Sequence, residues 1–266
     1  MTETDVLTGR VAIVTGAGRG IGRAIAVAMA GAGAAVATCD MADGARATAD
    51  EIVAAGGRAT SFTCDVSDPQ QVQELVGAAV ATYGRLDVLV NNAGVSGPAG
   101  RAHEIDIDGW DRAVAVNLRG PFLCARFAIP HLLEQDRAAI VNIASTYGIV
   151  GAPRTPAYCA SKGGVVNLTR QLAVDYGCEG LRVNAILPGY IDTDMGGRRA
   201  SLPADQAAAA LARREANAAL QPLGRQAQAD EVARVAVFLA SDAASFMTGS
   251  IVTVDGGCTA TFRHGV

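Results

Sequence analysis

The sequence predicts an α/β fold, with a single doubly wound domain, a seven-stranded parallel sheet and helices on both faces of that sheet. Three observations predict it. Short runs rich in β-branched residues alternate with longer helical stretches along most of the 266 residues. The runs are continuously apolar rather than strictly alternating, as expected for strands that are covered on both faces. Repeated strand, helix and strand also implies right-handed crossovers between parallel strands.

The predicted elements follow in order along the chain. The strands are RVAIVT (10–15), AVATC (35–39), ATSFT (59–63), LDVLV (86–90), AIVNIA (139–144), RVNAIL (182–187) and SIVTV (250–254). The helical stretches are 20–32, 43–55, 68–83, 107–134, 157–177 and 229–240. Asp68 and Pro69 suit the start of the third helix, because aspartate caps an N-terminus and proline fits the first turn.

Residues 189–225 interrupt this alternation, because they contain no strand and suggest short helices flanked by glycine and proline. An excursion of that length on a compact sheet is usually a lid or a binding loop. The chain contains no internal repeat, linker or low-complexity tract that would mark a boundary. We therefore expect one domain over residues 1–266, with a substrate lid at about 189–225.

Composition narrows the class of protein. Half of the chain is hydrophobic and 18% is charged, which excludes a disordered protein, and the net charge of −4 disfavours nucleic acid and membranes as partners. The polar, acidic amino terminus does not resemble a secretory signal. Six scattered cysteines without a CxxC pair predict reduced thiols in the cytoplasm, and three histidines without ligand spacing predict no metal site.

A glycine-rich turn, TGAGRGIG (15–22), follows the first strand and opens the first helix. Its spacing is GxxxGxG, with Gly16, Gly20 and Gly22, and Gly18 is additional. Glycine permits a tight turn and lets the backbone approach a pyrophosphate, which the N–H groups of the helix N-terminus then bind. This position predicts a Rossmann-like dinucleotide-binding domain.

Asp40 ends the second strand, eighteen residues after Gly22, where a ribose-binding acid is expected. A carboxylate there accepts hydrogen bonds from the ribose hydroxyls and repels a 2′-phosphate. Met41 follows, so no arginine stands next in sequence to receive that phosphate. Arg19 in the glycine loop favours NADP instead, but the poorly solvated like charges of Asp40 and a phosphate would repel. The sequence therefore predicts NAD(H) in preference to NADP(H).

Lys162 is the only lysine among 22 basic residues, in AYCASKGG (157–164). It follows Tyr158 by four residues, so the two side chains lie on one face of the predicted helix. A phenol titrates near 10, and a neighbouring ammonium stabilises its anion. Ser145 ends the fifth strand thirteen residues before Tyr158, at the sheet edge where α/β proteins bind ligands. These three residues predict proton transfer to a substrate oxygen.

With these features the sequence resembles the short-chain dehydrogenase/reductase family, in its single-domain branch, from about Gly9 to Gly257. The motifs that carry the resemblance are TGAGRGIG (15–22), CDV (64–66), NNAG (91–94), VNL (116–118), Ser145, YCASK (158–162), PGYIDT (188–193) and DGG (255–257). They occur in the order that is typical of the family.

The resemblance implies roles for particular residues. It implies a catalytic tetrad of Asn117, Ser145, Tyr158 and Lys162, in which Asn117 kinks the long helix and holds a water bonded to Lys162. It implies cofactor contacts by the glycine loop with Arg19 and Ile21, by Asp40, Asp65 and Val66, by Asn92, Ala93 and Gly94, and by Tyr158 and Lys162. Pro188, Gly189, Ile191 and Thr193 would line the nicotinamide.

The expected reaction is hydride transfer between NAD(H) and a secondary alcohol or ketone, with Tyr158 as general acid and base. Three alternatives are a 3-oxoacyl-thioester reductase that uses NADPH, a sugar-nucleotide epimerase or dehydratase, and a non-catalytic protein that senses dinucleotides. The substrate pocket would come from residues 95–100, 146–157 and the lid, and their small and apolar side chains favour a hydrophobic alcohol or ketone. The family commonly forms homotetramers, and the apolar faces at 113–128, 157–173 and 250–262 permit one.

Overall fold

The computed structural model describes residues 5–193, 202–219 and 221–261, without the side chains of residues 213, 214 and 217. Seven parallel strands form one sheet in the order β3-β2-β1-β4-β5-β6-β7. The strands are β1 (Val11–Thr15), β2 (Ala35–Asp40), β3 (Arg58–Thr63), β4 (Val88–Asn91), β5 (Ala139–Ile143), β6 (Arg182–Pro188) and β7 (Ile251–Val254). The predicted seven-stranded, doubly wound sheet is confirmed, and the predicted strand limits differ from these by two residues at most.

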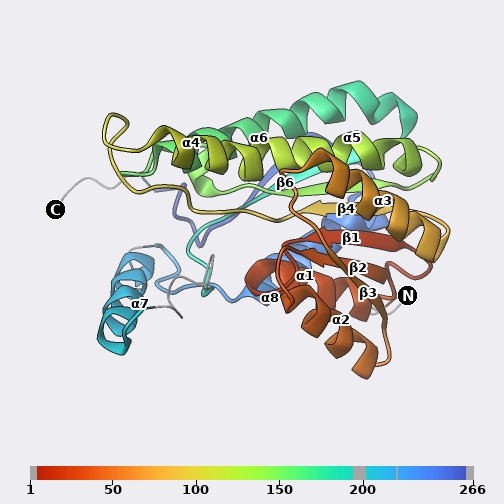
Figure 1. The fold of residues 1–266 in the computed structure, drawn as a ribbon, viewed down its shortest axis with the longest axis horizontal. Coiled ribbons are helices and arrows are strands. Elements are labelled where there is room, and N and C mark those ends of the chain that lie inside the picture. The colour runs from red at the N-terminus through yellow and green to blue at the C-terminus, as the bar shows by residue number, and fades with distance from the viewer. Residues whose placement is uncertain (1–4, 194–201, 220, 262–266) are drawn as a thin grey trace.

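Helices cover both faces of the sheet (Figure 1). The helices are α1 (Gly20–Gly31), α2 (Gly44–Ala54), α3 (Pro69–Tyr83), α4 (Ile107–Val114), α5 (Gly120–Leu132), α6 (Pro156–Tyr176), α7 (Ala204–Ala219) and α8 (Ala229–Ala240). One core packs apolar residues of α3, α5 and α6 on the sheet, and a second packs those of α1, α2 and α8 on the other face. Burial on both faces explains why the strands are continuously apolar.

The start of α3 agrees with the prediction from Asp68 and Pro69. The Asp68 carboxylate accepts hydrogen bonds from the backbone N–H groups of Gln70 at 2.9 Å and Gln71 at 3.3 Å. Gly84 ends the helix in the left-handed region, with φ of 79°. Such side-chain and glycine caps satisfy backbone groups that a helix end leaves unpaired.

The stretch predicted as one helix at 107–134 consists of three pieces. α4 is followed by the π-helical segment η1 (Ala115–Arg119), and α5 completes the stretch. A π-helical turn inserts an extra residue into the hydrogen-bond ladder and often marks a functional site. Asn117 lies in the middle of this segment.

The predicted lid at 189–225 contains one described helix, α7, where the sequence suggested short helices. Residues 194–201 and residue 220 of that stretch lie outside the described residues. In Figure 1, α7 stands apart from the sheet and its covering helices. The functions of the lid and the single domain over residues 1–266 stay predictions.

The sheet order reverses its direction of progression between β1 and β4. All seven strands are parallel, so their carboxyl ends meet at one edge of the sheet. In open α/β sheets the crevice at such a reversal, outside the strand ends, is where ligands bind. The glycine loop after β1 and the segment after β4 both begin there.

Candidate active site

Helix α6 presents Tyr158 and Lys162 on one face, four residues apart. Pro156 occupies the first turn of the helix, where its fixed φ is favourable. The ammonium of Lys162 lies 5.8 Å from the centroid of the Tyr158 ring. The structure therefore brings together the phenol and the amine that the sequence places one turn apart.

Lys162 is buried, with 4% of its surface exposed. Its Nζ donates a hydrogen bond of 2.7 Å to the carbonyl of Ile143, the last residue of β5. Burial lowers the pKa of Lys162 to about 8, because removal from water disfavours the charged form. Arginine keeps its charge at any accessible pH, so lysine is the basic residue suited to this place.

Ser145 follows β5 by two residues and is also buried. Its backbone is extended and its Oγ accepts a hydrogen bond of 3.2 Å from the N–H of Tyr147. Burial raises the pKa of Tyr158, and a hydrogen bond with the Ser145 side chain opposes that shift without cancelling it. Ser145 and Tyr158 can therefore both hydrogen-bond to one substrate oxygen.

The expected lowering of the Tyr158 pKa by Lys162 is wrong for this structure. The ammonium faces the ring and bonds to the Ile143 carbonyl, and it is not among the causes of the shift. Desolvation of the phenol outweighs the favourable hydrogen bond from Ser145, so the protonated form is favoured.

Asn117 is fully buried within η1 and joins two segments of the site. Its Oδ1 accepts from the N–H of Val95 at 2.8 Å, and its Nδ2 donates to the Val95 carbonyl at 2.9 Å. The same Nδ2 donates to Ser161 Oγ at 3.1 Å, and Ser161 Oγ donates to the Tyr158 carbonyl at 2.9 Å. Asn117 therefore fixes the turn that carries Tyr158. The water between Asn117 and Lys162 stays a prediction.

The glycine loop forms a close-packed cradle between β1 and α1. Gly16 and Gly20 have φ values of 65° and 54°, in the left-handed region that favours glycine. A Cβ atom on Gly22 would lie 2.1 Å from the Gly16 carbonyl oxygen. The N-cap residue Arg19 makes no side-chain cap, and the first turn of α1 carries no acid. The first N–H groups of α1 are thus suited to an anionic phosphate.

The segment after β4 is fastened to this cradle through Thr15. Its Oγ1 accepts hydrogen bonds from the N–H groups of Asn92 at 3.0 Å and Ala93 at 3.1 Å. Asn92 Nδ2 donates to the carbonyls of Thr15 at 2.9 Å and Gly16 at 3.1 Å. Ile21 packs on the core below α1.

Gly94 stands beside Lys162, at the end of the same segment. A Cβ atom there would lie 3.2 Å from Asn117 Oδ1 and 3.6 Å from Lys162 Nζ. The residues that the sequence assigned to the cofactor and those that it assigned to catalysis therefore meet at Gly94.

Asp40 lies directly beside the glycine loop. Its Oδ2 accepts a hydrogen bond of 3.1 Å from the N–H of Gly18, and its Oδ1 accepts one of 3.3 Å from Ala42. A Cβ atom on Gly18 would lie 2.8 Å from the same Oδ2 and 3.1 Å from the backbone of Gly44, so glycine favours this close approach. Arg19 is exposed at the outer side of the loop. The carboxylate, rather than the guanidinium, is fixed in place.

Asp65 and Val66 follow β3. Burial would raise the pKa of Asp65, but hydrogen bonds from Ser67 and from Arg112, together with the charge of Arg112, prevail and lower it. Val66 is buried against Gly120, where a Cβ atom would lie 2.9 Å from a valine methyl. Close packing with α5 therefore fixes this end of β3.

The segment after β6 reaches the glycine loop. Gly189 donates a hydrogen bond of 3.0 Å to the carbonyl of Val254, and Pro188 before it is the last residue of β6. Thr193 lies over the loop, since a Cβ atom on Gly20 would be 3.3 Å from its methyl group. The Ile191 side chain is buried in the core, so only its backbone could line a ligand.

Two tyrosines extend the site beyond Ser145. The ring of Tyr147 meets that of Tyr158 edge-on, with centroids 6.3 Å apart. Its hydroxyl lies 3.5 Å from the hydroxyl of Tyr190, and burial raises the pKa of Tyr147. The phenol rings form an apolar wall with two hydroxyl groups at its end.

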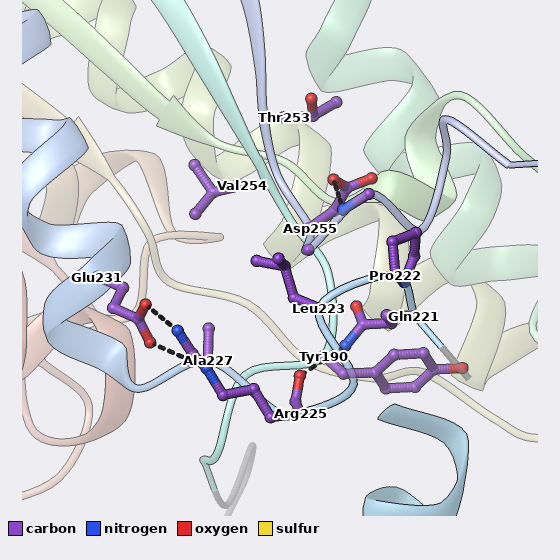
Figure 2. Close-up of a pocket in the computed structure, with 12 residues that line it drawn as sticks. Tyr190, Gln221, Pro222, Leu223, Arg225, Ala227, Glu231, Thr253, Val254 and Asp255 are labelled. Atoms are coloured by element: carbon purple, nitrogen blue, oxygen red, sulfur yellow. Dashed lines mark hydrogen bonds and ion pairs between the residues drawn. The ribbon is translucent and has the colours of Figure 1, made fainter. Parts of the chain in front are cut away.

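A cavity of about 410 Å³ lies next to this wall, at the carboxyl ends of β6 and β7 (Figure 2). Arg225 and Glu231 form an ion pair of 2.8 Å at one side of it. Its lining residues are Tyr190, Gln221, Pro222, Leu223, Arg225, Ala227, Glu231 and residues 253–257. Residues 190, 221–223 and 225 of the predicted lid line this cavity, whereas segments 95–100 and 146–157, with Ser145, Tyr158 and Lys162, do not. The substrate pocket that the sequence suggested therefore stays a prediction.

Sequence reasoning missed three residues that the structure places in the site. Thr15 and Ser161 carry buried hydroxyls that hold the segments described above. Thr15 belongs to the glycine-loop motif and Ser161 to the YCASK motif. A hydroxyl at the end of a buried strand was an available signal for Thr15. Arg112 contacts Asp65 from 47 residues away, and no local pattern indicates it.

Among the helices within the described residues, none is both long enough and apolar enough to cross a membrane. The six cysteines, which all lie within the described residues, form no disulfide.

Comparison with known proteins identifies relatives over nearly the whole chain. A family model described as enoyl-(acyl carrier protein) reductase matches residues 16–259. Cis-4-hydroxycyclohexanecarboxylate dehydrogenase of Sinomonas cyclohexanicum is 47% identical over 94% of this chain and 97% of its own length. Cyclohexanol dehydrogenase of Acinetobacter sp. strain SE19 is 38% identical over 94% of this chain and 95% of its own length.

Two solved structures are similar as well. Levodione reductase has a TM-score of 0.90 and 36% identity, and the match covers 96% of this chain and all of that one. A candidate NAD(P)-dependent gluconate 5-dehydrogenase from Beutenbergia cavernae, with NADP bound at low occupancy, has a TM-score of 0.86. Its identity is 40%, over 97% of this chain and all of that one.

Proposed function

The chain belongs to the short-chain dehydrogenase/reductase family, and from this premise we propose that it interconverts a secondary alcohol and a ketone with NAD(H). It is an NAD(P)-dependent oxidoreductase that acts on alcohols. The observation that carries the proposal is the convergence of Ser145, Tyr158 and Lys162 at the carboxyl ends of the strands, beside the glycine cradle.

The side chains have distinct proposed tasks. Tyr158 gives its proton to the carbonyl oxygen in reduction and takes it back from the alcohol in oxidation. Ser145 donates a hydrogen bond to the same oxygen and stabilises charge that develops on it. Lys162, whose ammonium lies over the Tyr158 ring, would hold the ribose, and Asn117 fixes the turn that carries Tyr158. The nicotinamide, when bound, supplies or accepts the hydride, which no side chain can do.

The cradle fits a dinucleotide. Several of its glycines leave no room for a Cβ atom, and the uncapped start of α1 offers N–H groups to a pyrophosphate. Gly16, Arg19, Gly20, Ile21 and Gly22 would surround the phosphates. Asn92 and Gly94 would lie at the ribose, and Thr193 with the backbone of 188–191 would face the nicotinamide.

We propose NAD(H) over NADP(H), because the Asp40 carboxylate is held beside Gly18 where it would accept from a ribose hydroxyl and repel a 2′-phosphate. One similar structure contains bound NADP, but that describes the cofactor of that protein and not of this chain. Asp40→Ala should therefore raise the ratio of catalytic efficiencies for NADP over NAD by about tenfold to a hundredfold, or roughly 1–3 kcal/mol. Asp43→Ala, which removes an exposed aspartate nearby, is the control.

The proposed substrate is a small alcohol or ketone with a hydrophobic body. The apolar wall of Tyr147 and Tyr190 supports this choice. Relatives named for cyclohexanol and for cis-4-hydroxycyclohexanecarboxylate suggest a six-membered ring as the first substrates to try. A panel of ring and chain alcohols should also contain a 3-oxoacyl thioester and an enoyl thioester, because the family model carries the latter name.

The function is tested by following NADH at 340 nm with this panel, in the wild type and in Tyr158→Phe. The variant should lose about a thousandfold in turnover, in the middle of the range that a general acid and base typically contributes, and should still bind NADH. Tyr176→Phe, at the other end of α6, should remain active. A Tyr158→Phe protein with near-normal turnover would contradict the mechanism.

A wild type that binds dinucleotides yet converts no compound of the panel would favour a sensing protein instead. The homotetramer is likewise a proposal. It is supported by the edge strand β7 and by exposed apolar side chains such as Phe122, Val174 and Phe246, and sedimentation velocity would test it.

A further inference from the structure

Arg112 lies on α4, on the outer side of the site, and reaches two chain segments that are far apart in sequence. Its Nη1 donates to Asp65 Oδ2 at 3.1 Å and to Ser67 Oγ at 3.1 Å. Its Nη2 lies 3.6 Å from the sulfur of Met41. One guanidinium thus bridges the turn after β3 and the residue after β2.

These two segments flank the place proposed for adenosine. Met41 directly follows Asp40, whose carboxylate is proposed to bind the ribose, and Asp65 stands at the end of β3. Arg112 and Met41 are both partly exposed, with 46% of the arginine side chain and 57% of the methionine open to solvent. The guanidinium therefore lies at the surface, across the residues that follow β2 and β3, and is not part of the core.

The bond to Asp65 does not prevent Asp65 from binding a ligand. Asp65 Oδ1 accepts from the N–H and the hydroxyl of Ser67, at 2.9 and 2.7 Å, and Oδ2 accepts from Arg112 alone. A carboxylate has about four acceptor positions, so Oδ2 retains one. The carboxylate can bind an amino group while Arg112 stays in contact with it.

A surface ion pair alone would be worth little, because solvent and salt screen it. A guanidinium is also flat and weakly hydrated, and it stacks on aromatic rings. We propose that Arg112 stacks on the adenine ring of the bound dinucleotide and closes the adenosine end of the site. This inference rests on the proposed function, because it needs adenosine to bind between Asp40 and Asp65.

The test measures binding without turnover. NADH affinity is followed by its fluorescence and ADP-ribose affinity by calorimetry, in the wild type, Arg112→Met, Arg112→Lys and Arg119→Met. Arg119 is the matched control, since it holds the same turn through a bond of 3.1 Å to the Ser67 carbonyl. Circular dichroism checks that each variant is folded.

We expect Arg112→Met to weaken both ligands by the same factor, fivefold to twentyfold, because both carry the adenosine. Arg112→Lys should remain nearly as weak, since lysine keeps the charge but lacks the flat surface. Arg119→Met should bind within twofold of the wild type.

Three results would overturn the inference. These are an Arg112→Met protein with wild-type affinity, an Arg119→Met protein that is weakened equally, and an Arg112→Lys protein with full affinity. Equal losses would mean that the turn matters and not the guanidinium, and full rescue by lysine would mean that charge suffices. A wild type that binds neither ligand would instead refute the proposed dinucleotide function.

Discussion

The glycine loop after β1 and the buried polar residues around the end of β5 lie at the same edge of the sheet, but different features of their side chains keep them in shape. The first depends on missing side chains, because Gly16, Gly18 and Gly22 let backbone and carboxylate approach one another closely. The second depends on buried polar side chains, since Lys162 bonds to the Ile143 carbonyl, and Asn117 bonds to Ser161, which bonds in turn to the Tyr158 carbonyl.

The difference shows how the two halves of the site keep their shape. In the half of the site formed by the glycine loop (the glycine half), an added side-chain atom would overlap its neighbours, so steric exclusion fixes the geometry. In the half formed by Lys162, Asn117 and Ser161 (the polar half), each side chain keeps its position because leaving a buried donor or acceptor unpaired costs free energy. Three substitutions test this contrast, each with a control.

The largest effect is expected in the glycine half. Gly22→Ala would place a methyl group 2.1 Å from the Gly16 carbonyl oxygen and 2.3 Å from Asn92 Nδ2. We expect the free energy of unfolding to fall by about 3 kcal/mol, at the upper end of the cost of overpacking, and NADH binding to be lost.

Gly31→Ala at the far end of the same helix α1 is the control, because no atom lies within 4 Å of the added Cβ. It should stabilise the protein by about 0.5 kcal/mol. Urea denaturation of both variants measures the contrast. Equal stability of the two would show that the cradle is not sterically closed.

The next effect is a pH dependence in the polar half. The pKa of Lys162 is about 8 in the folded protein and about 10.4 in an unfolded chain. Between these values the unfolded chain binds more protons, so the free energy of unfolding rises with pH. The contribution is complete above the unfolded pKa and is lost as the pH falls through the folded pKa.

Between pH 8 and 9.5 the wild type should gain about 2 kcal/mol from this residue, and Lys162→Met should lack that gain. Urea denaturation at both pH values measures it. Other titrating groups are the same in both proteins, so the difference isolates Lys162. Parallel curves for the two proteins would show that the amine is not desolvated.

The smallest effect concerns the polar chain behind the site. Asn91 Nδ2 donates to Asn142 Oδ1 at 2.8 Å, and Asn142 Nδ2 donates to Thr169 Oγ1 at 2.9 Å, all of them buried. Thr169→Val keeps the shape but leaves the Asn142 amide without that acceptor. The cost should be about 1–2 kcal/mol.

Thr82→Val is a close control. Both threonines bond to the carbonyl four residues earlier, but Thr82 is exposed on α3 and accepts nothing from a buried group. Its replacement should change the free energy of unfolding by less than about 0.5 kcal/mol. If the two variants were equally stable, the buried chain would contribute nothing beyond the shape of its side chains.

The glycine half could be predicted from the sequence because its signals are local. The cradle is eight consecutive residues, and glycine identity reports close approach wherever it occurs. The strand limits were predicted within two residues because burial on both faces produces continuous apolar runs. The spacing of four residues between Tyr158 and Lys162, which is also a local signal, placed both side chains on one helical face.

The polar half was predicted less completely. The resemblance implied a kink at Asn117 but not its π-helical form, since Asn117 bonds to the segment after β4, 22 residues away. The raised pKa of Tyr158 reversed an expectation, because desolvation depends on what the whole fold packs around the phenol.

By itself, the sequence determined the order of the elements, the two-sided core, the glycine cradle and the pairing of Tyr158 with Lys162, because each follows from local spacing and apolar periodicity. Only the tertiary structure decided that Lys162 bonds to the Ile143 carbonyl, that Thr15 and Ser161 support the site, and that Arg112 bridges Asp65 and Met41. Such contacts join segments whose separation in the chain carries no spacing rule, so they exist only once the sheet has brought the segments together.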